Sequence, residues 1–276
     1  MAHDTFLDRP TTTSRTSFGE LQLLVLYRDA SAAFAFFRVD PERAAAVLAD
    51  VPVSPARFGT GTAVAVLAAY DYRDTSIGPY REVASALAVV PRGVAAPTLA
   101  LLHLLRESAH EDVGWYVLDL PVTTGVANAG GRELYGLAKF ETDIVVELAE
   151  AQVNAVVLAP TGEGPSVALE GRLAAGIPVG TMDLVVYSVL DRELLRTVVE
   201  ARGRLHTGLG RALTLHVGGS DHPMARRLAA LGLDGARPFV AQVCLEYRAV
   251  LNAPTAFRSL RTAGRARARG RVAKAG

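Results

Sequence analysis

The sequence predicts an α+β domain that is mainly antiparallel β, with a curved sheet that closes into a barrel- or cone-like body and a few peripheral helices. Many segments alternate apolar and polar residues with the two-residue period of a strand. Most are joined by short turns that contain Gly or Pro, which favours antiparallel pairing over crossover connections. About ten strands must close or pack face to face, because an open sheet leaves unpaired edges.

The predicted strands are apolar or alternating stretches that end at turn residues. They cover residues 62–72, 81–90, 114–122, 143–150, 153–160, 166–175, 211–218 and 239–251. The last shows the period most clearly, because every odd position is apolar while Gln242, Glu246 and Arg248 fall on the other face. Such a strand has one face toward a core and one toward a polar environment.

Three helices are predicted from their capping residues. The first covers 40–52, with Asp40 as N-cap, Pro41 at the first helical position and a proline as the stop. The other two, 191–203 and 221–232, each open at an aspartate and close at a glycine. Three short helices cannot cover both faces of a large sheet, so we expect them at its rim.

The domain organisation follows from composition. Residues 1–17 are rich in Thr, Ser and charge and predict a flexible N-terminal arm. Residues 256–276 hold seven Arg or Lys and no acid, which predicts a basic disordered tail. Residues 18–255 contain no repeat and no linker, so we expect a single domain there.

The bulk composition excludes several classes of function. The chain has 276 residues and a formal net charge of +1, which gives no reason to expect nucleic acid or a membrane as a partner. The single cysteine, Cys244, excludes an internal disulfide and fits a reducing compartment. Residues 1–18 lack the apolar core of a signal peptide, so we expect a cytoplasmic protein. The six histidines follow no metal-ligand spacing and no nucleotide-binding motif is present, so we expect neither a metal nor a cofactor.

Glu82 is an unusual residue for its predicted strand. It shares one face with Ala84 and Ala86, and a carboxylate facing small side chains suits a cavity wall where a ligand has room. The alternative is a solvent-facing glutamate at a strand start, with the alanines packed against another layer. The strand pattern leaves both interpretations open.

Lys139 also has two interpretations. Alternation continued from Leu137 places it on a polar face with Glu141, where an ion pair would keep an ordinary lysine charged. The alternative is an amine kept in apolar surroundings between Ala138 and Phe140, which would make it a nucleophile. By period alone the ordinary surface lysine is favoured.

Three segments resemble the acetoacetate decarboxylase superfamily. They are "FFRVDPERAAAVL" at 36–48, "YRDTSIGPYREV" at 72–83, and "PVTTGVANAGGRELYGLAKFETDI" at 121–144. They occur in the family order, and the resemblance extends over residues 20–250. It implies that Lys139 is the Schiff-base lysine, that Glu82 is the active-site glutamate, and that the protein forms a homo-oligomer.

The resemblance also implies the surroundings of these two residues. The substrate-binding residues that we expect from it are Tyr80, Ala84, Ala86, Arg132 and Phe140. The glycines and charged residues of the segment Gly131–Gly136 would shape the turn that brings the lysine into the barrel.

The chain departs from the family pattern in four places. Phe140 stands where the decarboxylase has a second lysine, and Ala138 where it has a proline. The predicted strand 62–72 has no acid before its end. Arg28 and Arg38 both lie near the expected position of a carboxylate-binding arginine, but neither aligns with it. Which arginine binds the substrate therefore stays open.

The function expected from the resemblance is a lyase that acts through a lysine Schiff base on a small keto acid. The first candidate reaction is decarboxylation of an acetoacetate-like β-keto acid. A second is aldol condensation or dehydration of a pyruvate-like keto acid through the same imine. A third is a non-catalytic barrel that binds a small carboxylated or polyketide-like ligand.

Overall fold

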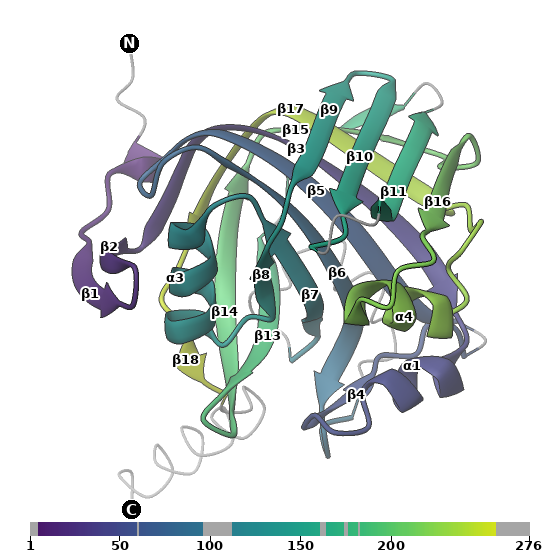
Figure 1. Cartoon of the computed structure of the whole chain (residues 1–276), viewed down its shortest axis with the longest axis horizontal. Helices are drawn as coiled ribbons and strands as arrows, with labels where there is room; N and C mark the ends of the chain where they lie inside the picture. The colour runs from purple at the N-terminus through teal and green to yellow at the C-terminus, as the bar shows by residue number, and fades with distance from the viewer. Residues whose placement is uncertain are drawn as a thin grey trace, which may run out of the picture.

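The computed structural model describes residues 5–59, 61–95, 112–160, 164–173, 176–181 and 183–257. Its centre is a closed barrel of seven strands (Figure 1). In their order around the barrel these are β17 (Val240–Leu251), β3 (Val25–Val39), β5 (Ala63–Thr75), β6 (Tyr80–Pro91), β7 (Gly114–Val122), β13 (Leu184–Leu190) and β14 (Glu193–Arg202). Strand β14 pairs with β17 and closes the ring. The predicted fold class is confirmed, although β7 and β13 pair in parallel.

Short strands extend the barrel at its edges. They are β4 (Val53–Pro55) on β6, β8 (Lys139–Glu141) on β7, β15 (Arg204–Gly208) on β17, β12 (Ile177–Gly180) on β15 and β18 (Thr255–Ala256) on β14. A separate antiparallel sheet consists of β9 (Ile144–Ala149), β10 (Gln152–Leu158), β11 (Pro165–Arg172) and β16 (Leu213–Val217). Strand β9 contacts β3, β5, β6 and β17, so this sheet packs against the outside of the barrel.

The barrel strands are buried on both faces, which explains why they are rich in alanine and valine. On β3, Ala32 and Phe34 belong to the core inside the barrel. Ala33, Ala35 and Phe37 belong to the core between the barrel and its covering layer. A sheet that is covered on both sides needs apolar residues at consecutive positions, and small ones where two layers approach.

Two of the three predicted helices are confirmed. In α1 (Pro41–Val47), the Asp40 carboxylate accepts hydrogen bonds from the backbone N–H groups of Glu42 at 2.9 Å and Arg43 at 3.0 Å. Helix α4 (Pro223–Ala230) begins one residue later than predicted, because His222 rather than Asp221 is the N-cap. Both helices lie near the lower rim of the barrel in Figure 1.

The predicted helix 191–203 is wrong. Asp191 and Arg192 have φ of 50° and 68° and form the turn of a hairpin, and the rest of the segment is strand β14. The run Thr197, Val198 and Val199 is β-branched, and such residues pack well in a sheet but restrict a helix. The aspartate that resembled a helix cap is therefore a turn residue.

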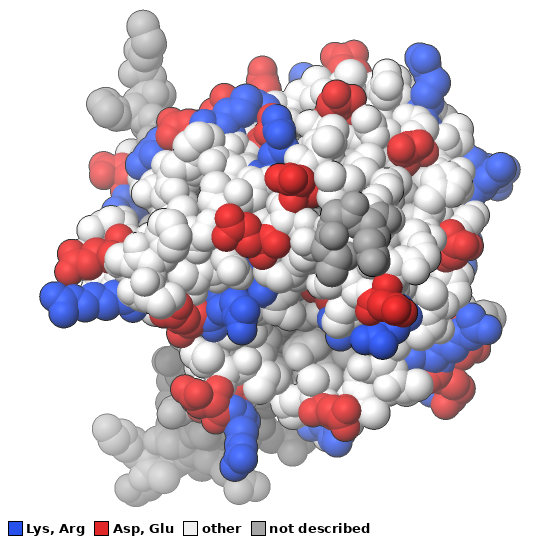
Figure 2. All heavy atoms as spheres, viewed as in Figure 1, with Lys and Arg blue, Asp and Glu red and all other residues white. Residues whose placement is uncertain are grey.

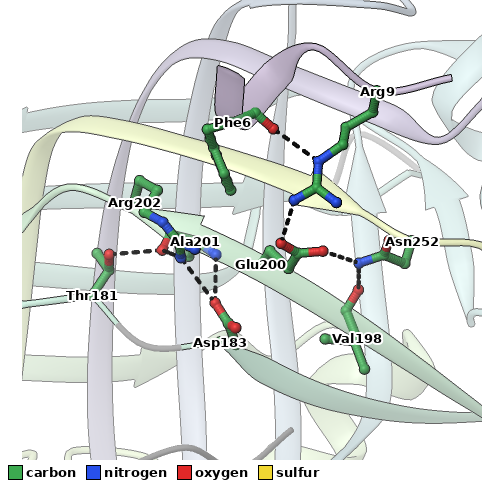
Figure 3. Close-up of polar contacts among 9 residues, drawn as sticks. All are labelled: Phe6, Arg9, Thr181, Asp183, Val198, Glu200, Ala201, Arg202 and Asn252. Carbon is green, nitrogen blue, oxygen red and sulfur yellow. Dashed lines mark hydrogen bonds and ion pairs between the residues drawn. The ribbon is translucent and has the colours of Figure 1, made fainter. Parts of the chain in front are cut away.

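The described part of the N-terminal segment differs from the flexible arm that we expected. Strand β1 (Thr12–Thr16) forms a hairpin with β2 (Gly19–Leu23), and a short 3-10 helix, η1 (Thr5–Leu7), precedes it. Arg9 fixes this segment to the barrel through an ion pair of 2.8 Å with Glu200 on β14 (Figure 3). Asn252 donates to the same carboxylate at 3.1 Å. Arg9 and Glu200 are 191 residues apart in the chain, so local composition does not reveal this contact.

The predicted basic tail lies outside the described residues from position 258 onward, and its first residue, Ala256, belongs to β18. Figure 2 shows positive and negative side chains interspersed over one face of the molecule, consistent with the near-neutral net charge. Within the described ranges, no helix is long and apolar enough to cross a membrane.

Candidate active site

Lys139 and Glu82 meet inside the barrel. Strand β7 lies between their two strands, with Leu120 opposite Lys139 and Val122 opposite Glu82. The Lys139 Nζ lies 2.5 Å from the Glu82 Oε2, and the two side chains are only 5% and 8% exposed. At this degree of burial each charge needs the other, because a single buried charge without a partner strongly destabilises a fold. The structure thus brings together the two residues that the sequence analysis singled out.

The inward direction of Lys139 follows from the shortness of β8. This strand ends at Glu141, so the alternation expected from Leu137 to Glu147 does not continue as one strand. Glu141 is exposed on the outside, and the carboxylate that pairs with the lysine comes from β6 instead. The polar face predicted for Lys139 is therefore wrong.

Helix α3 (Gly125–Tyr135), which was not predicted, delivers the lysine to the barrel. Gly131, Arg132 and Glu133 lie within this helix rather than in a turn. Gly136 ends the helix with φ of 61°, a left-handed conformation that favours glycine. Glu133 has a different role from the expected one, because its carboxylate accepts a hydrogen bond of 2.9 Å from the backbone N–H of Ser17. It thereby holds the β1–β2 hairpin against the helix.

Gly131 leaves the space that the Lys139 side chain occupies. A Cβ atom at position 131 would overlap the Cδ and Cε atoms of Lys139. The aliphatic part of the lysine therefore lies directly against the helix backbone, and the helix fixes where its amine points. A side chain at this position would compete with the lysine for the same volume.

We expect Gly131→Ala to impair the site while the fold is retained. Alanine is favoured over glycine in a helix by about 1 kcal/mol, so the helix itself should not be weakened. The added methyl group should displace the Lys139 amine from Glu82 and lower the rate of imine formation at least ~10-fold, as expected for a misplacement of about 1 Å. Borohydride trapping and far-UV circular dichroism measure the two effects. Gly180→Ala is the control, because no atom lies within 4 Å of that added Cβ, and equal trapping in both variants would contradict this role of Gly131.

A cavity of about 90 Å³ lies beside the ion pair. Its lining combines aliphatic side chains with tyrosines and contains both members of the pair. The lining residues with titratable side chains are Tyr27, Tyr70, Tyr72, Glu82, Lys139 and Tyr247. Of the predicted small residues, Ala84 lines the cavity, while Ala86 is buried inside the barrel but not on the cavity wall. Among the described lining residues, Lys139 and Glu82 are the only ones with charged side chains.

Tyr80 contacts the lysine from another side. The Lys139 Nζ lies 5.5 Å from the centre of its ring, within range of a cation–π interaction. The Tyr80 hydroxyl lies 3.1 Å from that of Tyr27, and both residues line a smaller space of about 20 Å³ next to the lysine. Leu21 of the hairpin lines the same space, so the N-terminal segment takes part in enclosing Lys139.

The tyrosines inside the barrel were missed by the sequence analysis, apart from Tyr80. Tyr70 lies opposite Glu82 and Tyr72 opposite Tyr80 across the β5–β6 hairpin. Burial is the first cause that raises the pKa of Tyr27, Tyr70, Tyr72 and Tyr80 well above the usual range. For Tyr27, Tyr72 and Tyr80 the negative charge of Glu82 is the second cause of the raised pKa. Their hydroxyls therefore stay protonated. The two-residue spacing of Tyr70 and Tyr72 indicates that both side chains lie on one face of a strand. That this face is the one that carries Glu82 follows only from the register of the hairpin.

Of the five predicted substrate-binding residues only Ala84 lines this cavity, and Arg132 and Phe140 lie outside the barrel interior. Arg132 is exposed on α3, and Phe140, which follows Lys139 on β8, points to the other side of that strand. The Phe140 ring packs against His222, with 4.3 Å between the ring centres. Successive residues on a strand face opposite sides, so a lysine inside the barrel requires its neighbour to lie outside. Both residues instead line, together with Lys139, a separate pocket of about 380 Å³, so their predicted contact with a substrate stays a prediction.

Neither candidate for the carboxylate-binding arginine reaches the cavity. Arg28 forms an exposed ion pair of 3.2 Å with Asp74. Arg38 lies over the ring of Phe239, 4.6 Å from its centre, and is exposed. In the described ranges no group of three or more His, Cys, Asp or Glu residues is placed to hold a metal ion.

Comparison with known proteins agrees with this architecture. The sequence profile of the family described as "Acetoacetate decarboxylase (ADC)" matches residues 8–163. A solved acetoacetate decarboxylase from Legionella pneumophila is 14% identical, with a TM-score of 0.59 and coverage of 85% of this chain and 87% of that one. Another structure, described as "Structural Studies of Acetoacetate Decarboxylase", is 15% identical, with a TM-score of 0.58 and coverage of 93% and 98%.

A third similar structure is described as "Enduracididine biosynthesis enzyme MppR complexed with pyruvate". It is 14% identical to this chain, with a TM-score of 0.56 and coverage of 84% and 89%. At these identities the solved structures establish a shared fold. Comparison with curated proteins finds no match.

Proposed function

Since this chain belongs to the acetoacetate decarboxylase family, we propose that it is a carbon–carbon lyase that forms a Schiff base between Lys139 and a small keto acid. The observation that carries the proposal is the buried Lys139–Glu82 pair beside a mainly apolar cavity. In the described part of the chain Lys139 is the only lysine, while arginines occupy many surface positions. An arginine cannot become a neutral amine nucleophile, so the proposed chemistry explains why this buried position holds a lysine.

The Lys139–Glu82 pair can provide a neutral amine without a change in the net charge of the site. A lysine must lose a proton before it attacks a carbonyl group, and Glu82 lies within one hydrogen bond of the Nζ. Transfer of that proton leaves a neutral amine beside a carboxylic acid, so the net charge of the site does not change.

The reaction would then proceed in four steps. The Lys139 nitrogen attacks the ketone carbon, and the Glu82 proton leaves with the former carbonyl oxygen as water, which gives an iminium ion. The bond to the carboxylate carbon breaks, its electron pair moves toward the iminium nitrogen, and CO₂ departs from the resulting enamine. Glu82, now a carboxylate, takes up a proton from solvent and passes it to the enamine carbon. Water then hydrolyses the iminium ion and restores the amine.

Aldol condensation or dehydration of a pyruvate-like acid is the second candidate. The observation that favours it is the shared fold with a protein that was solved in complex with pyruvate. The same iminium ion on Lys139 would serve this reaction, because its nitrogen accepts electrons from the neighbouring carbon in both cases. The two reactions differ in whether CO₂ is released.

Borohydride trapping tests the proposal. The chain has two lysines, Lys139 and Lys274, so the adduct can be assigned by peptide mass alone. With acetoacetate or pyruvate, we expect borohydride to fix the reduced ligand on the peptide that contains Lys139. Lys274→Arg is the matched control and should keep the adduct, whereas Lys139→Arg should lose it. CO₂ release separates the two reactions, and a folded protein that gives no adduct with either acid would be a binding protein instead.

A further inference from the structure

The cavity has no spare cation for a substrate carboxylate. Among the described lining residues, the positive charge of Lys139 is matched by Glu82, and Arg28, Arg38 and Arg132 lie outside. A keto acid nevertheless brings a negative charge into this space. Building on the proposed function, we propose that the hydroxyl groups of Tyr70 and Tyr247 bind the substrate carboxylate in place of an arginine.

The two tyrosines occupy the right part of the cavity. Both line it together with Lys139 and Glu82. Tyr70 lies opposite Glu82 in the β5–β6 register, and the rings of Tyr70 and Tyr247 are 5.9 Å apart. Tyr70 also stacks on Tyr72 with an interplanar angle of 9°, which fixes its ring. A ligand on Lys139 that is only a few atoms long can therefore reach this wall of the cavity.

These two hydroxyls differ from those of Tyr27, Tyr72 and Tyr80 in having no protein partner among the described residues. The hydroxyls of Tyr27 and Tyr80 bond to each other at 3.1 Å, and that of Tyr72 donates to Glu82 at 3.5 Å. Within the described ranges, the hydroxyls of Tyr70 and Tyr247 make no hydrogen bond, although the residues are only 9% and 2% exposed. Both residues line the cavity, so a hydroxyl without a protein partner there can donate to an oxygen of a ligand.

The protonation of the phenols suits this role. Burial is the main cause that raises the pKa of both Tyr70 and Tyr247 far above the usual range. Both hydroxyls therefore donate hydrogen bonds over the whole physiological pH range. The negative charge of Glu82 acts on both hydroxyls and that of Asp183 on Tyr247, and both contribute to the raised pKa values.

Neutral donors have a consequence for decarboxylation. An arginine forms charge-assisted hydrogen bonds that stabilise a carboxylate strongly. That carboxylate loses its charge as CO₂ departs, so strong binding of the ground state would oppose the reaction. Phenol hydroxyls orient the group and hold it more weakly, which favours its loss.

Calorimetric titration with butyrate tests the carboxylate site separately from the imine. Butyrate has a carboxylate but no ketone, so its binding does not require a reactive Lys139. We expect wild-type protein to bind it, and Tyr70→Phe and Tyr247→Phe each to weaken binding about 10-fold, the loss typical of one hydrogen bond to a charged group. Tyr116→Phe is the matched control, because this half-buried tyrosine packs on the outside of the barrel. Absence of butyrate binding, or equal binding by all variants, would overturn the proposal.

Trapping with 2,4-pentanedione, a neutral diketone, completes the test. We expect the two phenylalanine variants to form this adduct on Lys139 with half-saturation within about twofold of wild type, because no carboxylate is involved. A parallel loss for butyrate and for the diketone would mean that the hydroxyls only support the barrel structure and would overturn the carboxylate site. Absence of any adduct in wild type that still binds butyrate would instead contradict the imine chemistry and leave the carboxylate site supported.

Discussion

Lys139→Met is expected to abolish imine formation and to lower the free energy of unfolding by roughly 3–5 kcal/mol, the usual cost of breaking a buried ion pair. Methionine matches the length of the aliphatic part of lysine but leaves Glu82 buried without its cation. Urea denaturation measures the loss of stability, and borohydride trapping measures the loss of the amine.

The double variant Lys139→Met/Glu82→Gln is the control for this prediction. It removes both charges together, so most of the stability should return while the reactive amine stays absent. A single variant that is as stable as the double variant would show that Glu82 does not remain charged and buried in the way that we infer.

Glu82→Gln is expected to lower turnover of the true substrate by about 10²–10⁴-fold, the contribution typical of a positioned acid or base. Glutamine keeps the shape of the side chain but neither accepts the lysine proton nor returns it to the leaving oxygen. Trapping at Lys139 should persist at a reduced rate, since the nucleophile is still present. Steady-state kinetics and trapping together measure the two effects.

Glu141→Gln is the matched control for this experiment. Glu141 is two residues from Lys139 and is the acid that the alternation of the sequence paired with it, but it is exposed outside the barrel. Its replacement should leave turnover within about twofold of wild type, as is usual for surface substitutions. Unchanged turnover in Glu82→Gln would show that the assignment of Glu82 is wrong.

The strands were predictable because buried strands appear in the sequence as apolar or alternating stretches that end at turn residues. The stretch 114–122 was predicted with the bounds that β7 has, and α1 was predicted from Asp40 and Pro41, which act locally. Both kinds of signal lie within one element. They require no knowledge of where the rest of the chain runs.

The elements that were missed depend on distant contacts. Helix α3 contains Gly125, Gly130 and Gly131, which disfavour a helix by propensity, and it is stabilised by its packing on the barrel and the hairpin. The alternation of 239–251 places Val243 and Tyr247 on the same face of the strand, which differs from the arrangement in β17. Register shifts after Cys244 turn Tyr247 into the barrel, whereas Val243 faces the outer core.

The candidate site was predictable only in part for the same reason. Glu82 and Lys139 were found from a strand of small residues and from the family resemblance. Their tyrosine surroundings come from β3, β5 and β17, and only the register of the closed barrel brings these strands together. Arg132 and Phe140 were misplaced because neighbours in sequence were assumed to share a site.

The closure of the barrel by β17 has a consequence for biosynthesis. Leu251, at the end of this strand, lies opposite both Val25 of β3 and Val199 of β14. The ring therefore cannot close during translation until residue 251 has been synthesised. Contacts between such distant parts of a chain form slowly. Lys139 and Glu82 are thus fully enclosed only after the last long strand of the domain has paired on both of its edges.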